Sequence, residues 1–99
     1  MSGDIIPFEL RFDDEALADL YERLGRTRFP DQLEEAGWNY GTELSYLKEL
    51  IDYWASDFDW RVVEARFNSF DNHKTMVNDI DLHFIHQRSP EPAALPLII

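Results

Sequence analysis

The spacing of apolar residues changes once along this sequence, and that change limits what the chain can fold into. Between residue 13 and about residue 68, apolar side chains recur every three to four positions, which predicts amphipathic helices. After Asn68 they alternate, which predicts strands. The 99 residues leave room for one domain. We therefore expect an α/β arrangement within residues 1–99, with a helical meander over 1–70 and the first strands of a sheet over 71–99.

About three helices are predicted in the first part, two of them after a capping residue. Asp13 or Asp14 begins the first helix and Gly25 ends it. The second begins near Thr42, and a shorter third helix follows Asp59. The residues expected on the buried faces are Leu17, Leu20, Tyr21 and Leu24, then Leu44, Leu47, Leu50, Ile51 and Trp54, and finally Trp60, Val63 and Phe67.

A hairpin is predicted after the third helix. Its strands are His73–Val77 and Ile80–Gln87, joined by a tight turn at residues 78–79. An earlier segment, Ile5–Phe12, also alternates roughly and is expected to be extended. Because Pro7 has no N–H, this segment should lie at an edge or remain unpaired.

The last five residues, Leu95–Ile99, are apolar throughout apart from Pro96. Such a run is typical of a buried strand inside an α/β sheet. An apolar strand that has no neighbouring strand promotes aggregation. We therefore expect a strand at Leu95–Ile99, and a natural chain that continues beyond it.

The connector Phe29–Gly41 contains proline and glycine residues that interrupt regular structure, and it contains two large aromatic residues, Trp38 and Tyr40. Large aromatic side chains in a loop are rarely left in water, since each carries a large apolar surface. We expect both rings to hold the loop against a neighbouring surface.

Charge and cysteine content exclude several functions. The chain has 20 acidic and 9 basic residues, a net charge of −11, which repels nucleic acids and anionic membranes. It has no cysteine, which excludes disulfides, thiolate catalysis and cysteine-bound zinc. No signal peptide or membrane-spanning run is visible. A soluble, cytoplasmic protein is expected.

Six short stretches occur in an order and spacing typical of one family. They are Arg28–Asp31, Gly37–Gly41, Tyr46–Trp54, Phe58–Arg61, Ala65–Asn68 and Ile80–His86. Together they resemble the N-terminal domain of epoxide hydrolases related to the microsomal and juvenile-hormone enzymes, and the resemblance extends from about Ile6 to Ile99.

The resemblance implies an α/β-hydrolase parent whose N-terminal helices wrap the catalytic domain and support its lid. In the family, an aspartate attacks an epoxide carbon to form an ester, and a histidine-activated water hydrolyses the ester to a diol. Two lid tyrosines polarise the epoxide oxygen. All of these groups follow the position that matches Ile99. No catalytic, cofactor-binding or metal-binding residue is therefore assigned to this chain, and no cofactor is expected.

The partners that the resemblance implies are the catalytic domain and lid of the same protein, with a small-molecule epoxide as the substrate of the parent. The microsomal relatives of animals carry an N-terminal membrane anchor, whereas here the domain begins almost at Met1. No membrane or nucleic-acid partner is expected.

Some residues resemble sites but have simpler explanations. His83 and His86 are three apart on a strand, so they point to opposite faces and cannot chelate one ion. Core or interface packing is expected for the tyrosines Tyr40, Tyr46 and Tyr53, and helix capping for the acid pairs Asp13 with Asp14 and Asp57 with Asp59.

A different function stays open at this point. The acidic chain could be a standalone protein-interaction module that presents Trp38 and Tyr40 to a partner. A folded monomer with those rings exposed would favour the module, and an exposed apolar face would favour a domain of a larger enzyme.

Overall fold

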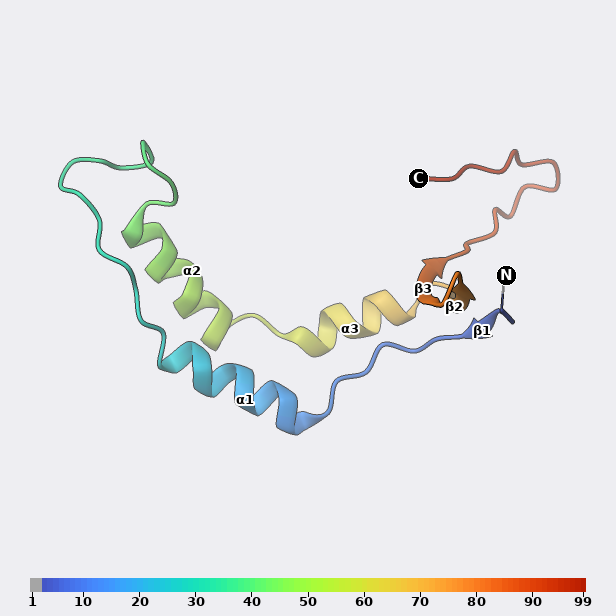
Figure 1. Cartoon of the computed structure of the whole chain (residues 1–99), viewed down its shortest axis with the longest axis horizontal. Helices are drawn as coiled ribbons and strands as arrows, with labels where there is room; N and C mark the ends of the chain where they lie inside the picture. The colour runs from blue at the N-terminus through green and yellow to red at the C-terminus, as the bar shows by residue number, and fades with distance from the viewer. Residues whose placement is uncertain (1–2) are drawn as a thin grey trace. The chain divides into compact units, whose positions relative to one another are not determined.

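The computed structural model describes residues 3–99, which form three helices and three strands (Figure 1). In chain order these are β1 (Ile6–Pro7), α1 (Asp14–Gly25), α2 (Leu44–Ser56), α3 (Trp60–Asn68), β2 (Asn72–Val77) and β3 (Ile80–Ile85). The chain divides into two compact units, one of residues 12–60 and the other of residues up to 11 together with 61–99. The predicted order of helices followed by a strand hairpin is confirmed.

In the first unit, α1 begins and ends where the sequence predicts. Asp13 is the N-cap, and its Oδ1 accepts the backbone N–H of Ala16 at 2.7 Å. This bond satisfies one of the N–H groups that a helix leaves free at its start. In the predicted stripe, Leu24 is buried at 8% exposure, and the other members, Leu17, Leu20 and Tyr21, are half-buried.

The start of α2 differs slightly from the prediction. Glu43, and not Thr42, is the N-cap, because its Oε2 accepts the N–H of Tyr46 at 2.7 Å and the hydroxyl of Ser45 at 2.5 Å. The connector also helps to begin this helix. The Gln32 side chain accepts the N–H of Leu44 and donates to the carbonyl of Gly37, both at 2.8 Å.

The buried side of α3 was predicted incorrectly at one position. Val63 is 38% exposed, whereas Glu64 is the buried residue of this helix. Arg61, one turn earlier, donates to both oxygens of the Glu64 carboxylate at 2.8 and 3.0 Å, so the buried carboxylate has a hydrogen-bonded partner of opposite charge. Phe67 is half-buried, as expected.

The sheet is antiparallel, in the order β1-β2-β3. Pro7 pairs with His73 on the outer strand β1, which confirms the expected edge position. The predicted turn is also confirmed. Asn78 and Asp79 have φ values of 50° and 64°, the left-handed pair that a two-residue hairpin turn requires.

The strand predicted at Leu95–Ile99 is absent from the structure. These residues lie in irregular chain, and Ile98 is 96% exposed. A strand needs a neighbour to satisfy its backbone N–H and C=O groups. No strand among residues 3–99 pairs with this segment. The composition of Leu95–Ile99 predicts a preference for the extended state, but it does not show whether another strand lies beside this segment.

The second unit is held together around the side chain of Asn72, which is 5% exposed. Its Nδ2 donates to the carbonyls of Phe67 and Phe70, both at 2.9 Å, and its Oδ1 lies 2.9 Å from Nε2 of His83. One amide thus joins the end of α3 to both strands of the hairpin. Because amide oxygen only accepts, Nε2 of His83 must carry the hydrogen.

We predict that Asn72→Ala lowers the free energy of unfolding by about 2–4 kcal/mol, since it removes three bonds and leaves their partners unsatisfied. Urea denaturation followed by far-UV circular dichroism measures the change. The matched control is Asn39→Ala on the exposed connector, expected within about 0.5 kcal/mol of the parent. Equal destabilisation by the two variants would contradict the role assigned to Asn72.

Candidate functional site

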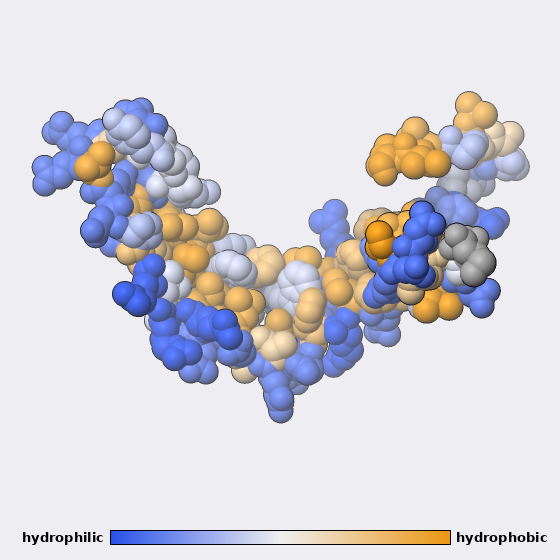
Figure 2. Space-filling model, in the orientation of Figure 1, coloured by the Kyte–Doolittle hydropathy of each residue, from blue (hydrophilic) through white to orange (hydrophobic). Residues whose placement is uncertain are grey.

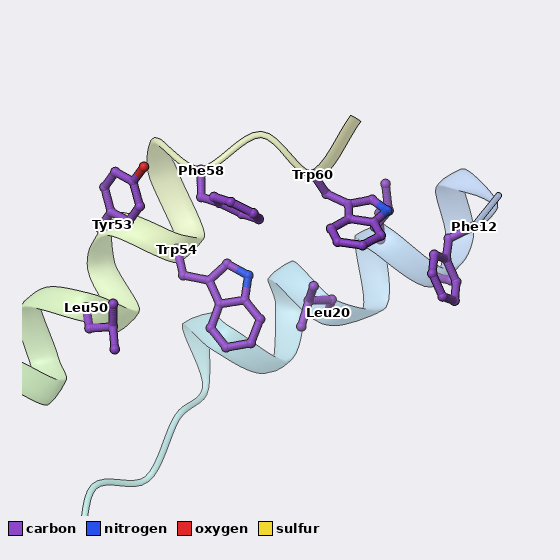
Figure 3. Close-up of a pocket in the computed structure, with 9 residues that line it drawn as sticks. Phe12, Leu20, Leu50, Tyr53, Trp54, Phe58 and Trp60 are labelled. Atoms are coloured by element: carbon purple, nitrogen blue, oxygen red, sulfur yellow. The ribbon is translucent and has the colours of Figure 1, made fainter. Parts of the chain in front are cut away.

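An apolar groove of about 700 Å³ lies between α1 and α2 (Figure 3). None of the described residues that line it is charged. The lining residues are Phe12, Ala16, Leu17, Leu20, Leu50, Tyr53, Trp54, Phe58 and Trp60. All of them belong to the unit formed by residues 12–60.

The groove follows from the helical spacing of the sequence. Ala16 and Leu20 are one turn apart on α1, and Leu50 and Trp54 are one turn apart on α2, so each pair projects from one face. The segment after α2 contributes Phe58 to the lining. There the hydroxyl of Tyr21 donates to the carbonyl of Phe58, at 3.5 Å.

Aromatic contacts fix the walls of the groove. The rings of Phe12 and Trp60 meet edge to face with their centroids 5.8 Å apart, and those of Tyr53 and Phe58 are 6.4 Å apart. The walls are therefore preformed, with ring geometries that aromatic pairs favour. In Figure 3, Trp54 projects from α2 toward α1 beside Leu20.

The stripe of α2 was expected to be buried, and the structure corrects this for two of its members. Leu50 is 43% exposed and Trp54 is 38% exposed. Figure 2 shows apolar side chains gathered on the surface over these helices. Each helix covers only part of the other, so the groove between them faces solvent. Contiguous exposed apolar surface of this kind marks an interaction site.

The aromatic residues of the connector behave differently from each other. The Trp38 ring lies against Tyr46 with the centroids 5.1 Å apart, so it contacts α2 as predicted. Tyr40 is 83% exposed, and the prediction that it packs against a surface is wrong in this structure. Tyr46 and Tyr53 both make ring contacts, in agreement with a packing role.

The histidines have structural surroundings. The ring of His83 stacks on Phe67 and meets Phe8 edge to face, with centroids 5.4 and 5.3 Å away. The backbone N–H of His86 donates to the carbonyl of Asp71. In residues 3–99 no group of three or more His, Cys, Asp or Glu side chains is placed to hold a metal ion.

The acid pairs are only partly explained by capping at helix starts. Asp13 caps α1 as predicted, and Asp59 directly precedes α3. Asp57, however, lies at the other end of a helix. It is the C-cap of α2, and its N–H donates to the carbonyl of Tyr53 at 2.8 Å. The expectation that Asp57 begins a helix is therefore wrong.

The sequence did not identify the groove as a site. Periodicity predicts that the stripes of α1 and α2 are core, and it predicts no groove lined by Phe12, Ala16 and Phe58. The number of aromatic residues near the two short helices could have indicated the groove. Their apolar surface is larger than the surface that one pair of helices can bury. The lining offers little chemistry beyond the Tyr53 hydroxyl and two indole N–H groups.

Residues 5–99 match the family described as epoxide hydrolase N terminus. Epoxide hydrolase 1 of Oryctolagus cuniculus is 37% identical over 87 residues, covering 88% of this chain and 19% of that protein. The crystal structure of juvenile hormone epoxide hydrolase from Bombyx mori superposes with a TM-score of 0.83 and 27% identity, covering 92% of this chain and 24% of that one. The structure of Aspergillus niger epoxide hydrolase superposes with a TM-score of 0.81 and 29% identity, covering 94% of this chain and 25% of that one.

The chain belongs to the epoxide hydrolase N-terminal family. It is homologous to epoxide hydrolases, and its helices and strands match the N-terminal part of their structures. The resemblance drawn from the six stretches is confirmed. The chain spans about a fifth to a quarter of the length of these relatives. Within residues 3–99, no helix combines the length and hydropathy needed to cross a bilayer.

The start of α2, which forms one wall of the groove, depends on an ionised cap. The hydroxyl of Ser45 and the N–H groups of Tyr46 and Ser45 stabilise the Glu43 carboxylate and lower its pKa below 4.5. The contribution of this cap to stability is therefore complete above pH 4.5 and is lost as the pH falls through the lowered pKa.

We predict that Glu43→Gln, which keeps an oxygen acceptor but does not titrate, is less helical than the parent at neutral pH. The difference should shrink as the pH falls below 4.5, because the parent then loses its carboxylate. Helicity measured by circular dichroism against pH tests this. The control is Glu49→Gln, within the same helix. A difference between parent and Glu43→Gln that does not change with pH would contradict the assignment.

Proposed function

We propose that residues 1–99 are the non-catalytic N-terminal domain of an enzyme that hydrolyses epoxides to vicinal diols through an aspartyl-ester intermediate. The match of residues 5–99 to the epoxide hydrolase N terminus is the observation that carries this proposal. The role of the domain is to cover apolar surface on a catalytic α/β-hydrolase domain and to support its lid.

The groove between α1 and α2 supports this role. It offers a large preformed apolar surface with no charged group in its lining. This surface needs a cover, and a catalytic domain in the same protein provides one at high effective concentration.

The catalytic groups belong, in this proposal, to the remainder of the enzyme. No lining residue of the groove is a carboxylate or a histidine, so the groove has neither the nucleophile nor the base that epoxide opening through an ester requires. The substrate is a small-molecule epoxide that binds outside this chain. The cytoplasmic location expected from the sequence stays a prediction.

The alternative, a standalone interaction module, has one observation in its favour. Tyr40 is exposed, and Trp38 is 60% exposed on the same loop. The apolar groove is the larger exposed feature, however, and the family match covers nearly the whole chain. The domain of an epoxide hydrolase is therefore the better-supported function.

We predict that the enzyme containing this chain converts a simple epoxide such as styrene oxide to its diol, and that the purified 99-residue chain does not. Chromatography of the diol measures both. The enzyme without residues 1–99 is the control, and it should be inactive or aggregated because its contact surface is bare. Diol formation by the 99-residue chain, or an inactive intact enzyme over a range of epoxides, would contradict the proposal.

A further inference from the structure

Negative charge is concentrated in the unit that contains the groove. Residues 12–60 include thirteen acidic and four basic residues, so this unit carries −9 of the total charge of −11. The rest of the chain has seven acidic and five basic residues and is nearly balanced at −2. An apolar groove thus lies in the strongly acidic part of the chain.

The cations of this unit are held away from the groove or paired. Arg23 bonds to Asp19 at 2.9 Å and Arg26 to Glu22 at 3.2 Å, each within α1. Lys48 lies over the ring of Phe29, with Nζ 5.8 Å from its centroid. Arg28, the fourth cation, is on the connector. None of them lines the groove.

Acidic residues, in contrast, adjoin the lining in sequence and along the helix. Glu49 precedes Leu50, and Asp57 follows Tyr53 by one helical turn and directly precedes Phe58. Neither carboxylate pairs with a cation in the part of the chain that the structure describes. A surface laid over the groove therefore meets uncompensated negative charge at its border.

We propose that the groove docks an apolar segment flanked by lysine or arginine, and that this segment belongs to the catalytic part of the same protein. The inference rests on the proposed function, and it adds the chemistry of the contact. The apolar centre supplies burial, and the basic flanks meet the acidic border, which is the arrangement that favours one register over others. A second copy of this chain is disfavoured, since it would bring a unit of charge −9 against another.

The test uses the intact enzyme with the photo-crosslinking residue p-benzoylphenylalanine in place of Leu50. The matched control places it at Asp52, two residues on and about 200° around the same helix. Light should join position 50 to a peptide of the same polypeptide whose apolar residues are flanked by Lys or Arg, with little product from position 52. A peptide without flanking cations, a second copy, or equal products from both positions would overturn the inference.

Charge reversal provides an independent measurement. Glu49→Lys with Asp57→Lys should lower the crosslinking yield from position 50 severalfold, whereas Asp52→Lys in the same background should leave it unchanged. The positive charge of a lysine at position 57 interacts favourably with the negative end of the helix dipole at the C-terminus of α2, so we expect the helix to be retained. Yields that do not respond to the double reversal would overturn the electrostatic part. Styrene oxide hydrolysis by the parent enzyme is assayed separately, so a failure of the proposed function is distinguishable from a failure of this inference.

Discussion

The apolar stripes of α1 and α2 place the central constraint on this chain, because two short helices cannot cover each other completely. A helix buries one face, and a pair of helices without a third layer leaves the remainder of both faces open. Here the remainder is a groove of about 700 Å³ lined by aromatic and aliphatic side chains. In residues 3–99 only two hydrophobic residues, Leu24 and Ala36, are buried. The helix pair is thus left with a large apolar surface that its own residues do not cover.

The other unit is organised by polar contacts. Asn72 joins the end of α3 to the hairpin through three hydrogen bonds, and His83 packs between Phe67 and Phe8 beside it. Polar side chains can specify one arrangement where apolar packing alone is sparse. The two strands of the hairpin pair in one register, from Asn72 with Ile85 to Val77 with Ile80.

Much of this fold could be predicted from the sequence because local signals agree with it. The cap at Asp13, the left-handed turn at residues 78–79 and the edge position of Pro7 are all decided by a few neighbouring residues. The features that were missed depend on distant partners. Glu64 is buried because Arg61 satisfies it, and Leu95–Ile99 is irregular because no strand lies beside it. The groove was missed for the same reason, since periodicity shows which face is apolar but not what covers it.

We expect the groove to be open in this chain and covered in the intact enzyme. Acrylamide quenching of Trp54 fluorescence tests this, with every other tryptophan of each protein, Trp38 and Trp60 included, replaced by Phe so that Trp54 is the single reporter. We expect strong quenching in the 99-residue chain, where the ring is partly exposed, and severalfold weaker quenching with blue-shifted emission in the intact enzyme. Equal quenching in the two proteins would contradict the claim, because the groove would then be open to water in both.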